Sequence, residues 1–276
     1  MATPTETPGF VPVSNWPTLE ELAAGYSEHL MPQSSMLHGK RFQHFFDNGF
    51  KISHHFVDGE TLDWKVLEGG DQTGLSGNAQ YKAYEVRSDI FFVDFYKPDY
   101  NEQVSLVLDV ITGQAVVGVS GFSDQGKERR TWTKFFNAIE DQRGAVDPYQ
   151  PTEELIGKHV LYRYTPRDAY EHVYLNKGTF LWHCLSGTEK GLADAEPCKM
   201  LKLRDSLYLL FWTETIMPVE SFIVVDLEAM RSAGRFFCWD PKPQRTVHVQ
   251  FGSYATVLAE TTAADVLAKP VPNGRI

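Results

Sequence analysis

The sequence has little of what marks secreted or membrane proteins. Its 276 residues include only three cysteines, Cys184, Cys198 and Cys238, with no Cys-x-x-Cys pair, which favours reduced thiols in a cytoplasmic protein over a disulfide framework. No apolar run reaches the roughly 18 residues of a transmembrane helix. The start, MATPTETPGF, lacks the basic and apolar regions of a signal peptide. We therefore expect a cytoplasmic protein with no membrane partner.

Basic charge is also scarce. Lys and Arg number 26 against 36 Asp and Glu, and the net charge is −10. Nucleic-acid binding needs a basic face, so no nucleic-acid partner is expected. With 42% hydrophobic and 13% aromatic residues, the chain is long enough for one large domain or two of ordinary size.

Motifs for cofactors and metals are missing as well. The nine histidines include no His-x-x-x-His pair, and the glycine-rich stretch 69–77 has no following lysine or helix that would make it a phosphate loop. No serine occupies a nucleophile elbow. The sequence therefore predicts neither a cofactor nor a metal site.

What the sequence does contain is an internal repeat. Residues 39–64 align without gaps on residues 157–182, and residues 90–95 match residues 207–212 at nearly the same offset. Identities in the first pair include His54 with His172 and Trp64 with Trp182. Two matching β-rich units of about 110 residues explain this pattern.

Each unit reads as a series of short alternating strands separated by turn signals such as Asp58-Gly59. Residues 130–136 could be helical, but their repeat partner alternates like a strand, so a strand is predicted there. About eight antiparallel strands can close into a barrel around one small ligand. The predicted fold is all-β, either two small barrels in tandem or two halves of a larger one.

The expected domains are an N-terminal lead and helix (1–38), a first unit (39–146) and a second unit (147–276), with the proline-containing link 141–154 at the boundary. Thr18 and Glu21 form a capping box for a short N-terminal helix of about residues 19–30, whose apolar positions recur with helical spacing. This helix is expected to pack on a sheet as a lid or plug.

In the second unit, aromatic and ionisable side chains recur at every second position of the predicted strands. Residues two apart in a strand share a face, so these side chains lie on one face of each strand. Such a face suits a pocket better than a plain core, because buried Tyr, His and Glu need partners. The candidates are Tyr162, Tyr164, Tyr170, His172, Tyr174, Trp182, Tyr208, Trp212 and Glu214. The matching positions of the first unit are mostly core types, so the pocket is expected in the second unit.

Four of these residues are candidate catalytic groups. Tyr162 and Tyr164 could donate two hydrogen bonds to one oxygen anion, or they could simply pack. His172 could be a general acid or base, or a structural histidine of the shared fold. Glu214 could be a desolvated acid with a raised pKa, or it could reach water at a strand end. The remaining candidates, Tyr170, Tyr174, Trp182, Trp212 and Tyr208, would bind the substrate.

The motifs YEHVYLN, FLWHCLSGTEKGLAD and LYLLFWTE, together with Gly157-Lys158 and the paired strand tyrosines, make the chain resemble the MoaF family. The resemblance covers roughly residues 39–260. It implies lipocalin-like, calycin-type units, one N-terminal and one C-terminal, and the family name points to molybdenum cofactor biosynthesis. Nothing in the sequence looks like a pterin or molybdate site.

The second unit is also similar to the phenolic acid decarboxylases, single lipocalin-like barrels that need no cofactor. That likeness implies that Tyr162 and Tyr164 hold a substrate carboxylate and that Glu214 takes part in proton transfer. The family's arginine is missing, because its place after the Ser186-Gly187 turn falls at about Leu192.

These observations lead to the hypothesis of a cofactor-independent lyase or isomerase that acts on a small aromatic or conjugated molecule, as in secondary metabolism. Decarboxylation, hydration, retro-aldol cleavage and cyclisation all remain open. The alternatives are a non-catalytic lipocalin-like small-molecule binder and a structural partner in an enzyme complex. Exposed barrel edges would also allow a homodimer.

Overall fold

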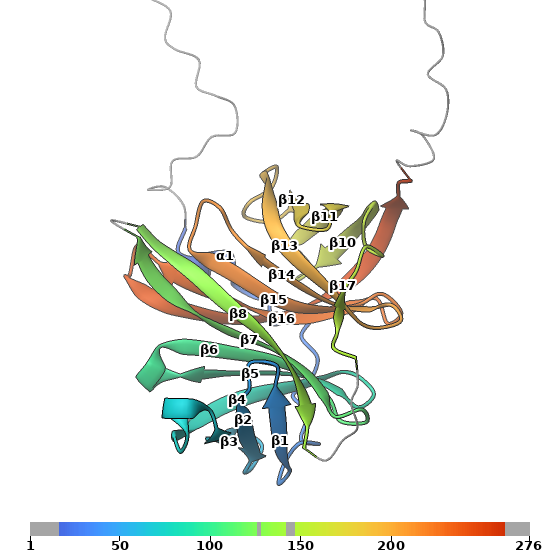
Figure 1. Ribbon diagram of the computed structural model, residues 1–276. Helices are drawn as coiled ribbons and strands as arrows, with labels where there is room; N and C mark the ends of the chain where they lie inside the picture. Colours follow the sequence, from blue (N-terminus) through green and yellow to red (C-terminus); the bar gives the residue numbers. More distant parts are fainter. Residues whose placement is uncertain (1–16, 126–127, 142–146, 263–276) are drawn as a thin grey trace, which may run out of the picture.

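In a computed structural model, the chain folds as two closed antiparallel β-barrels in tandem (Figure 1). This confirms the predicted fold class and decides against one larger barrel. The structure describes residues 17–125, 128–141 and 147–262, so the first 16 residues of the predicted lead lie outside the described part. Within that part, no helix is long and apolar enough to cross a membrane.

The first barrel is a meander of eight strands in chain order, closed by pairing of the first strand with the last. Short 3-10 helices, η2 (Gly70–Gln72) and η3 (Pro98–Tyr100), lie in two of its loops. Its strands are β1 (Arg41–Phe46), β2 (Lys51–Phe56), β3 (Thr61–Glu68), β4 (Ser76–Arg87), β5 (Ile90–Lys97), β6 (Glu102–Asp109), β7 (Gln114–Gln125) and β8 (Glu128–Glu140).

The second barrel repeats this plan. Pairing of β10 with β17 and of β12 with β13 closes it, and the two-residue strand β9 (Gln150–Pro151) joins the edge of β13. Its strands are β10 (Lys158–Arg163), β11 (Ala169–Asn176), β12 (Thr179–Ser186), β13 (Ala193–Arg204), β14 (Leu207–Thr213), β15 (Val219–Asp226), β16 (Arg231–Asp240) and β17 (Arg245–Glu260).

The barrels meet through strands that are buried on both faces. β5, β6, β14 and β15 are buried at nearly every position, as expected of strands without a solvent-facing side. One face of each lines its own barrel, and the other joins a shared apolar cluster that includes Phe92, Val107, Leu209 and Phe222. Figure 1 shows the first barrel, blue to green, against the second, yellow to red.

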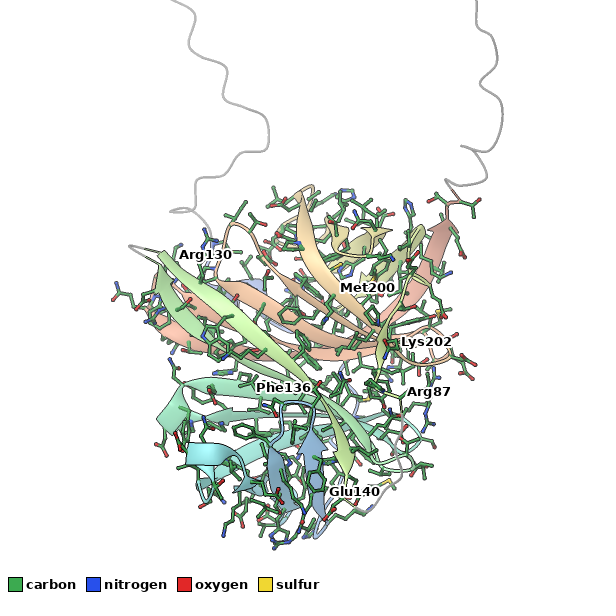
Figure 2. All side chains as sticks on the ribbon, in the orientation of Figure 1. Arg87, Arg130, Phe136, Glu140, Met200 and Lys202 are labelled. Atoms are coloured by element: carbon green, nitrogen blue, oxygen red, sulfur yellow. The ribbon has the colours of Figure 1, made fainter. Side chains whose placement is uncertain are left out.

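The long β7–β8 hairpin extends the contact between the barrels. Figure 2 shows β8 running from Arg130, beside the second barrel, to Glu140, beside the first. Arg130 donates to the backbone oxygen of Thr215, and the Thr133 hydroxyl donates to the Glu220 carboxylate. The predicted strand at 130–136 is therefore confirmed, and its outward face packs on the second barrel.

A buried arginine holds the same junction. Arg235 on β16 is 1% exposed, and its Nη1 lies 2.8 Å from Glu220 Oε1. Its guanidinium also donates to the hydroxyls of Ser105 and Ser120 in the first barrel. A buried charge needs such partners, so the two barrels cannot slide past each other without breaking the hydrogen bonds from Arg235 to Ser105 and Ser120.

The N-terminal helix is shorter than predicted. The capping box of Thr18 and Glu21 is present, but α1 covers only Leu19–Leu22. Gly25 takes a φ of +88°, which a right-handed helix cannot continue through and which glycine adopts readily. The chain then proceeds through turns, and residues 19–30, here called the N-terminal segment, pack against the second barrel.

Candidate functional site

The second barrel contains a cavity beneath the N-terminal segment. Its volume is about 80 Å³. The walls come from β11, β12, β14, β15, β16 and β17, from Tyr164 directly after β10, and from the loops that follow β12 and β14. The lining residues are Leu19, Leu22, Ala23, Tyr26, Tyr164, Tyr170, His172, Trp182, Glu189, Trp212, Glu214, Met217, Val219, Phe236, Cys238 and Val249.

Three nitrogen atoms of the lining side chains make no hydrogen bond of ordinary geometry with the residues that the structure describes. They are Nδ1 of His172, Nε1 of Trp182 and Nε1 of Trp212, and all three are buried. Leaving a buried polar atom unpaired costs about 1–3 kcal/mol, so such atoms are rare in native structures. The indole of Trp182 interacts with the Glu196 carboxyl and that of Trp212 with the Glu214 carboxyl, and each opposes the rise in that carboxyl's pKa. The imidazole nitrogen of His172 is therefore the atom that a polar ligand would satisfy.

His172 stands in an aromatic cage on β11. Its ring centroid lies 4.6 Å from that of Tyr162, 4.9 Å from that of Phe180 and 5.6 Å from that of Trp212. Burial lowers the pKa of His172 from 6.5 to about 3, because a cation here would lose its hydration without gaining a counter-ion. The imidazole is therefore neutral at pH 7 and can accept or donate a hydrogen bond.

Glu214 lies at the end of β14, where its backbone N–H donates to the backbone oxygen of Val219. Burial raises the pKa of Glu214 to about 8, with further contributions from the carboxylates of Glu196 and Glu189. The carboxyl group is thus mostly protonated at pH 7 and can act as a proton donor.

A chain of phenols joins the N-terminal segment to the loop after β12. The Tyr26 hydroxyl lies 2.8 Å from that of Tyr170, which donates to Glu189 Oε2 at 2.7 Å. Burial raises the pKa values of both phenols and of the Glu189 carboxyl. This chain closes one side of the cavity and ties the segment to the barrel.

The predicted tyrosine pair has two different environments. Tyr164 lines the cavity and stacks on Tyr26 with ring centroids 5.0 Å apart, and its hydroxyl has no hydrogen-bond partner among the described residues. Tyr162 is fully buried deeper in the barrel, and its hydroxyl lies 2.8 Å from that of Tyr174. The two phenols share a barrel face, but only Tyr164 is free to bond a molecule in the cavity.

The structure brings six of the nine predicted site residues together around the cavity: Tyr164, Tyr170, His172, Trp182, Trp212 and Glu214. Tyr162, Tyr174 and Tyr208 lie elsewhere in the same apolar core. The Tyr208 hydroxyl donates to Glu154 Oε2 at 2.9 Å. Their proposed roles in a site must therefore be indirect.

The sequence reasoning missed Tyr26 and Glu189. The sequence places Tyr26 on the apolar face of the predicted helix. The loop that carries Glu189 has no periodic pattern, so nothing in it predicts that the Glu189 side chain points inward. The only signal for Glu189 in the sequence is its position just after the Ser186-Gly187 turn. Among the residues that the structure describes, no group of three His, Cys, Asp or Glu side chains could hold a metal ion.

Comparison with known proteins identifies one family over most of the chain. A family model of the MoaF N-terminal domain matches residues 14–124, and one of the MoaF C-terminal domain matches residues 149–261. Protein MoaF of Klebsiella aerogenes is 30% identical over 231 residues, which cover 78% of this chain and 84% of that protein. The crystal structure of a candidate β-lactamase from Burkholderia vietnamiensis aligns with a TM-score of 0.34 and 12% identity, over 40% of this chain and 99% of that one.

Proposed function

This chain belongs to the MoaF family, and we propose that its second barrel is a cofactor-independent acid–base site for a small aromatic or conjugated molecule. The observation that carries the proposal is the buried, unpartnered imidazole of His172 on a cavity that also holds the Glu214 carboxyl. A cavity with aromatic walls and a few convergent polar groups with shifted pKa values is typical of a binding or catalytic site.

His172 and Glu214 would divide the proton transfers. Glu214, with a pKa of about 8, is the group that can give up a proton at neutral pH. His172, with a pKa of about 3, is neutral and can accept a hydrogen bond or a proton in the course of the reaction. Two titratable groups whose surroundings push their pKa values apart are the usual basis of an acid and base assignment.

The phenol of Tyr164 would hold an oxygen that gains negative charge. Preset donors in a site without water stabilise an enolate or phenolate strongly. Tyr162 and Tyr174 would support the aromatic floor, and Tyr170 would position Glu189. The reaction class would be that of a lyase or isomerase, such as decarboxylation, hydration, retro-aldol cleavage or cyclisation, as in secondary metabolism.

The N-terminal segment would act as the cover of the site. The cavity of about 80 Å³ is smaller than the roughly 300–1,000 Å³ of typical ligand pockets. A substrate would therefore enter when residues 19–26 move away. The contacts that would break include the Tyr26 hydroxyl bond and its ring stacking on Tyr164. They also include the bond from the Leu19 N–H to Asp240 and the ion pair of Glu20 with Arg245.

A non-catalytic binder is the second candidate, and the same tight closure favours it. Four apolar or aromatic side chains of the N-terminal segment, Leu19, Leu22, Ala23 and Tyr26, already fill the entrance. A protein that only stores or carries a ligand benefits from such a slowly exchanging cover.

A thermal-shift screen tests the proposal. Phenolic acids, aromatic aldehydes, aromatic amines and polyketide-like aromatics would be added to wild type, Tyr164→Phe and Tyr208→Phe. Ligands that bind the native state raise its Tm by mass action. We expect hits that weaken in Tyr164→Phe and persist in Tyr208→Phe, whose hydroxyl bonds Glu154 instead. A folded protein without any hit would contradict the proposal.

Glu214→Gln then separates catalysis from binding. Gln keeps the shape of the side chain but cannot donate a carboxyl proton. An enzyme should keep the ligand-induced Tm shift and lose turnover of the same compound by at least about 100-fold. A binder shows no turnover in wild type at all.

A further inference from the structure

The first barrel holds a larger cavity than the second. Its volume is about 530 Å³, within the roughly 300–1,000 Å³ of typical small-molecule sites. It opens at the equivalent end of the barrel, between the loops that carry Asn48, Gln72, Leu75 and Tyr100. The residues of the N-terminal segment that line the second cavity do not line this one.

Two tryptophans line the cavity, Trp64 from β3 and Trp132 from β8, each beside a glycine on the neighbouring strand. A Cβ at Gly77 would lie 2.8 Å from the Trp64 ring, and a Cβ at Gly121 would lie 2.5 Å from the Trp132 ring. Trp64 pairs with Gly77 and Trp132 with Gly121 across the strands. Because the indoles lie against these glycines, they line the walls and leave the space between them open.

The inner part of the cavity carries an unpartnered imidazole. His54 lines the cavity, is 7% exposed, and makes no hydrogen bond with the described residues. Its ring packs edge-on to Phe95 at 6.2 Å and lies 6.2 Å from the ring of His44. Burial lowers the pKa of His54 to about 3, so the ring is neutral and has one donor and one acceptor nitrogen.

The entrance carries more positive than negative charge. Lys97 pairs with Glu102 at 2.7 Å and lies over the rings of Trp64 and Tyr100 at 4.8 and 4.7 Å. Lys134 also lines the cavity, exposed to solvent, with its ammonium 5.4 Å from the Trp132 ring centroid and no carboxylate partner among the described residues. One cation is thus left for a ligand.

The two cavities differ in charge at equivalent positions. Lys97 and Glu214 are 117 residues apart, the offset between matching positions of the two units. Lys97 pairs across the strands with Glu102, and Glu214 bonds in the same way to Val219, which is 117 residues after Glu102. The first cavity therefore has a lysine where the second has a carboxyl group. The second cavity is lined by Glu189 and Glu214 without any Lys or Arg.

We propose that the first barrel is a second ligand site, specific for a small aromatic carboxylate with a hydroxyl or carbonyl at the end opposite the acid. The ring would lie between Trp64 and Trp132, the carboxylate would meet Lys134 and Lys97 at the entrance, and the opposite polar group would bond His54. This site is independent of the one in the second barrel.

Isothermal titration with three matched probes tests the site. The probes are 6-hydroxynaphthalene-2-carboxylate, naphthalene-2-carboxylate, which lacks the hydroxyl, and 6-hydroxynaphthalene-2-carboxamide, which lacks the charge. The proteins are the full chain and its variants Lys134→Met, His54→Phe, Lys65→Met and Tyr164→Phe. Lys65 is exposed on β3 and does not line the cavity, so it controls for the loss of one positive charge.

The hydroxy acid should bind wild type and Lys65→Met equally, and Lys134→Met about tenfold more weakly, as the loss of one charge-assisted contact implies. The amide should bind both lysine variants alike. Removing the probe's hydroxyl should weaken binding to wild type but not to His54→Phe. If His54→Phe does not fold, the two acids compared on wild type still test the deep contact.

Three results would overturn the proposal. One is the absence of saturable binding of the hydroxy acid to wild type. Another is equal weakening in Lys134→Met and Lys65→Met, which would mean that only the overall charge matters. The third is loss of binding in Tyr164→Phe, which would place the probe in the second barrel.

Discussion

Arg87 at the end of β4 forms an ion pair with Asp226 at the end of β15, with Nη2 2.5 Å from Oδ1. The reverse pair also exists: Arg204 at the end of β13 meets Asp109 at the end of β6 at 2.6 Å. The two arginines are 117 positions apart in the sequence, and so are the two aspartates. Each aspartate also accepts two backbone N–H bonds from the turn that follows it.

Reciprocal contacts of this kind define an isologous interface, in which the same patch on two units contacts itself. The two barrels of one chain are therefore arranged like the subunits of a two-fold dimer. The interface is inside the chain, so the two units are free to diverge in their cavities while the junction is retained.

The Arg87 pair should contribute measurably to stability. Arg87→Met leaves the Asp226 carboxylate, whose side chain is 5% exposed, without its cation, and breaking a buried pair costs about 3 kcal/mol. We expect a loss of that size in the free energy of unfolding in urea. Lys82→Met, on the exposed face of the same strand, should change it by less than about 0.5 kcal/mol. Equal losses in both variants would argue against the pair.

Glu214 should make stability fall as pH rises. Its pKa is about 8 in the folded chain against 4.5 for an unperturbed Glu, so its contribution to stability is full below pH 4.5 and is lost as pH rises through 8. Wild type should therefore lose about 2 kcal/mol more of its free energy of unfolding than Glu214→Gln does when the pH is raised from 5 to 8. This figure is reduced for the partial exposure of the side chain. Urea unfolding at both pH values measures this difference, and a pH-independent difference would contradict it.

His172 should have the opposite effect. Its pKa falls from 6.5 to about 3 on folding, so its contribution is present above pH 6.5 and is lost as pH falls toward 3. When the pH falls from 7.5 to 5, wild type should therefore lose about 2 kcal/mol more of its free energy of unfolding than His172→Phe does. Chemical denaturation at the two pH values checks this, with wild type as reference. Parallel acid sensitivity of the two proteins would show that His172 does not titrate as expected.

Gly252 should control the cover of the second cavity. A Cβ at this position would lie 2.5 Å from Leu30 Cα and 2.8 Å from the His29 oxygen, and the Gly252 N–H donates to the Tyr26 oxygen at 3.2 Å. Gly252→Ala should displace the N-terminal segment and cost about 1–3 kcal/mol. Hydrogen exchange of residues 19–30 should accelerate while the barrel strands stay protected.

Gly59→Ala is the matched control for that experiment. A Cβ at Gly59 meets no atom within 4 Å, so exchange in residues 19–30 should not change. If Gly252→Ala also leaves the exchange of these residues unchanged, the close approach does not hold the segment in place.

The sequence predicted the strands well, because strand formation depends on local patterns. The alternation in 157–182 and the apolar runs at 90–95 and 207–212 correspond to real strands, and the repeat resolved the ambiguity at 130–136. The helix length was wrong, because the conformation of Gly25 depends on the packing of residues 26–30 on the barrel. The capping box, a purely local feature, was predicted correctly.

By itself, the sequence determined two matching β-rich units, the shared inward face of the Tyr162 strand and the gathering of aromatic groups in the second unit, since strand parity and repeats depend only on residue order. Only the tertiary structure decided which inward groups reach a cavity. Strand parity tells which side chains point into a barrel but not how deep along its axis they lie. The sequence therefore could not show that Tyr162 bonds Tyr174 while Tyr164 lines the cavity with a free hydroxyl. The same applies to the larger cavity of the first barrel, which depends on glycines placed across from tryptophans by strand register.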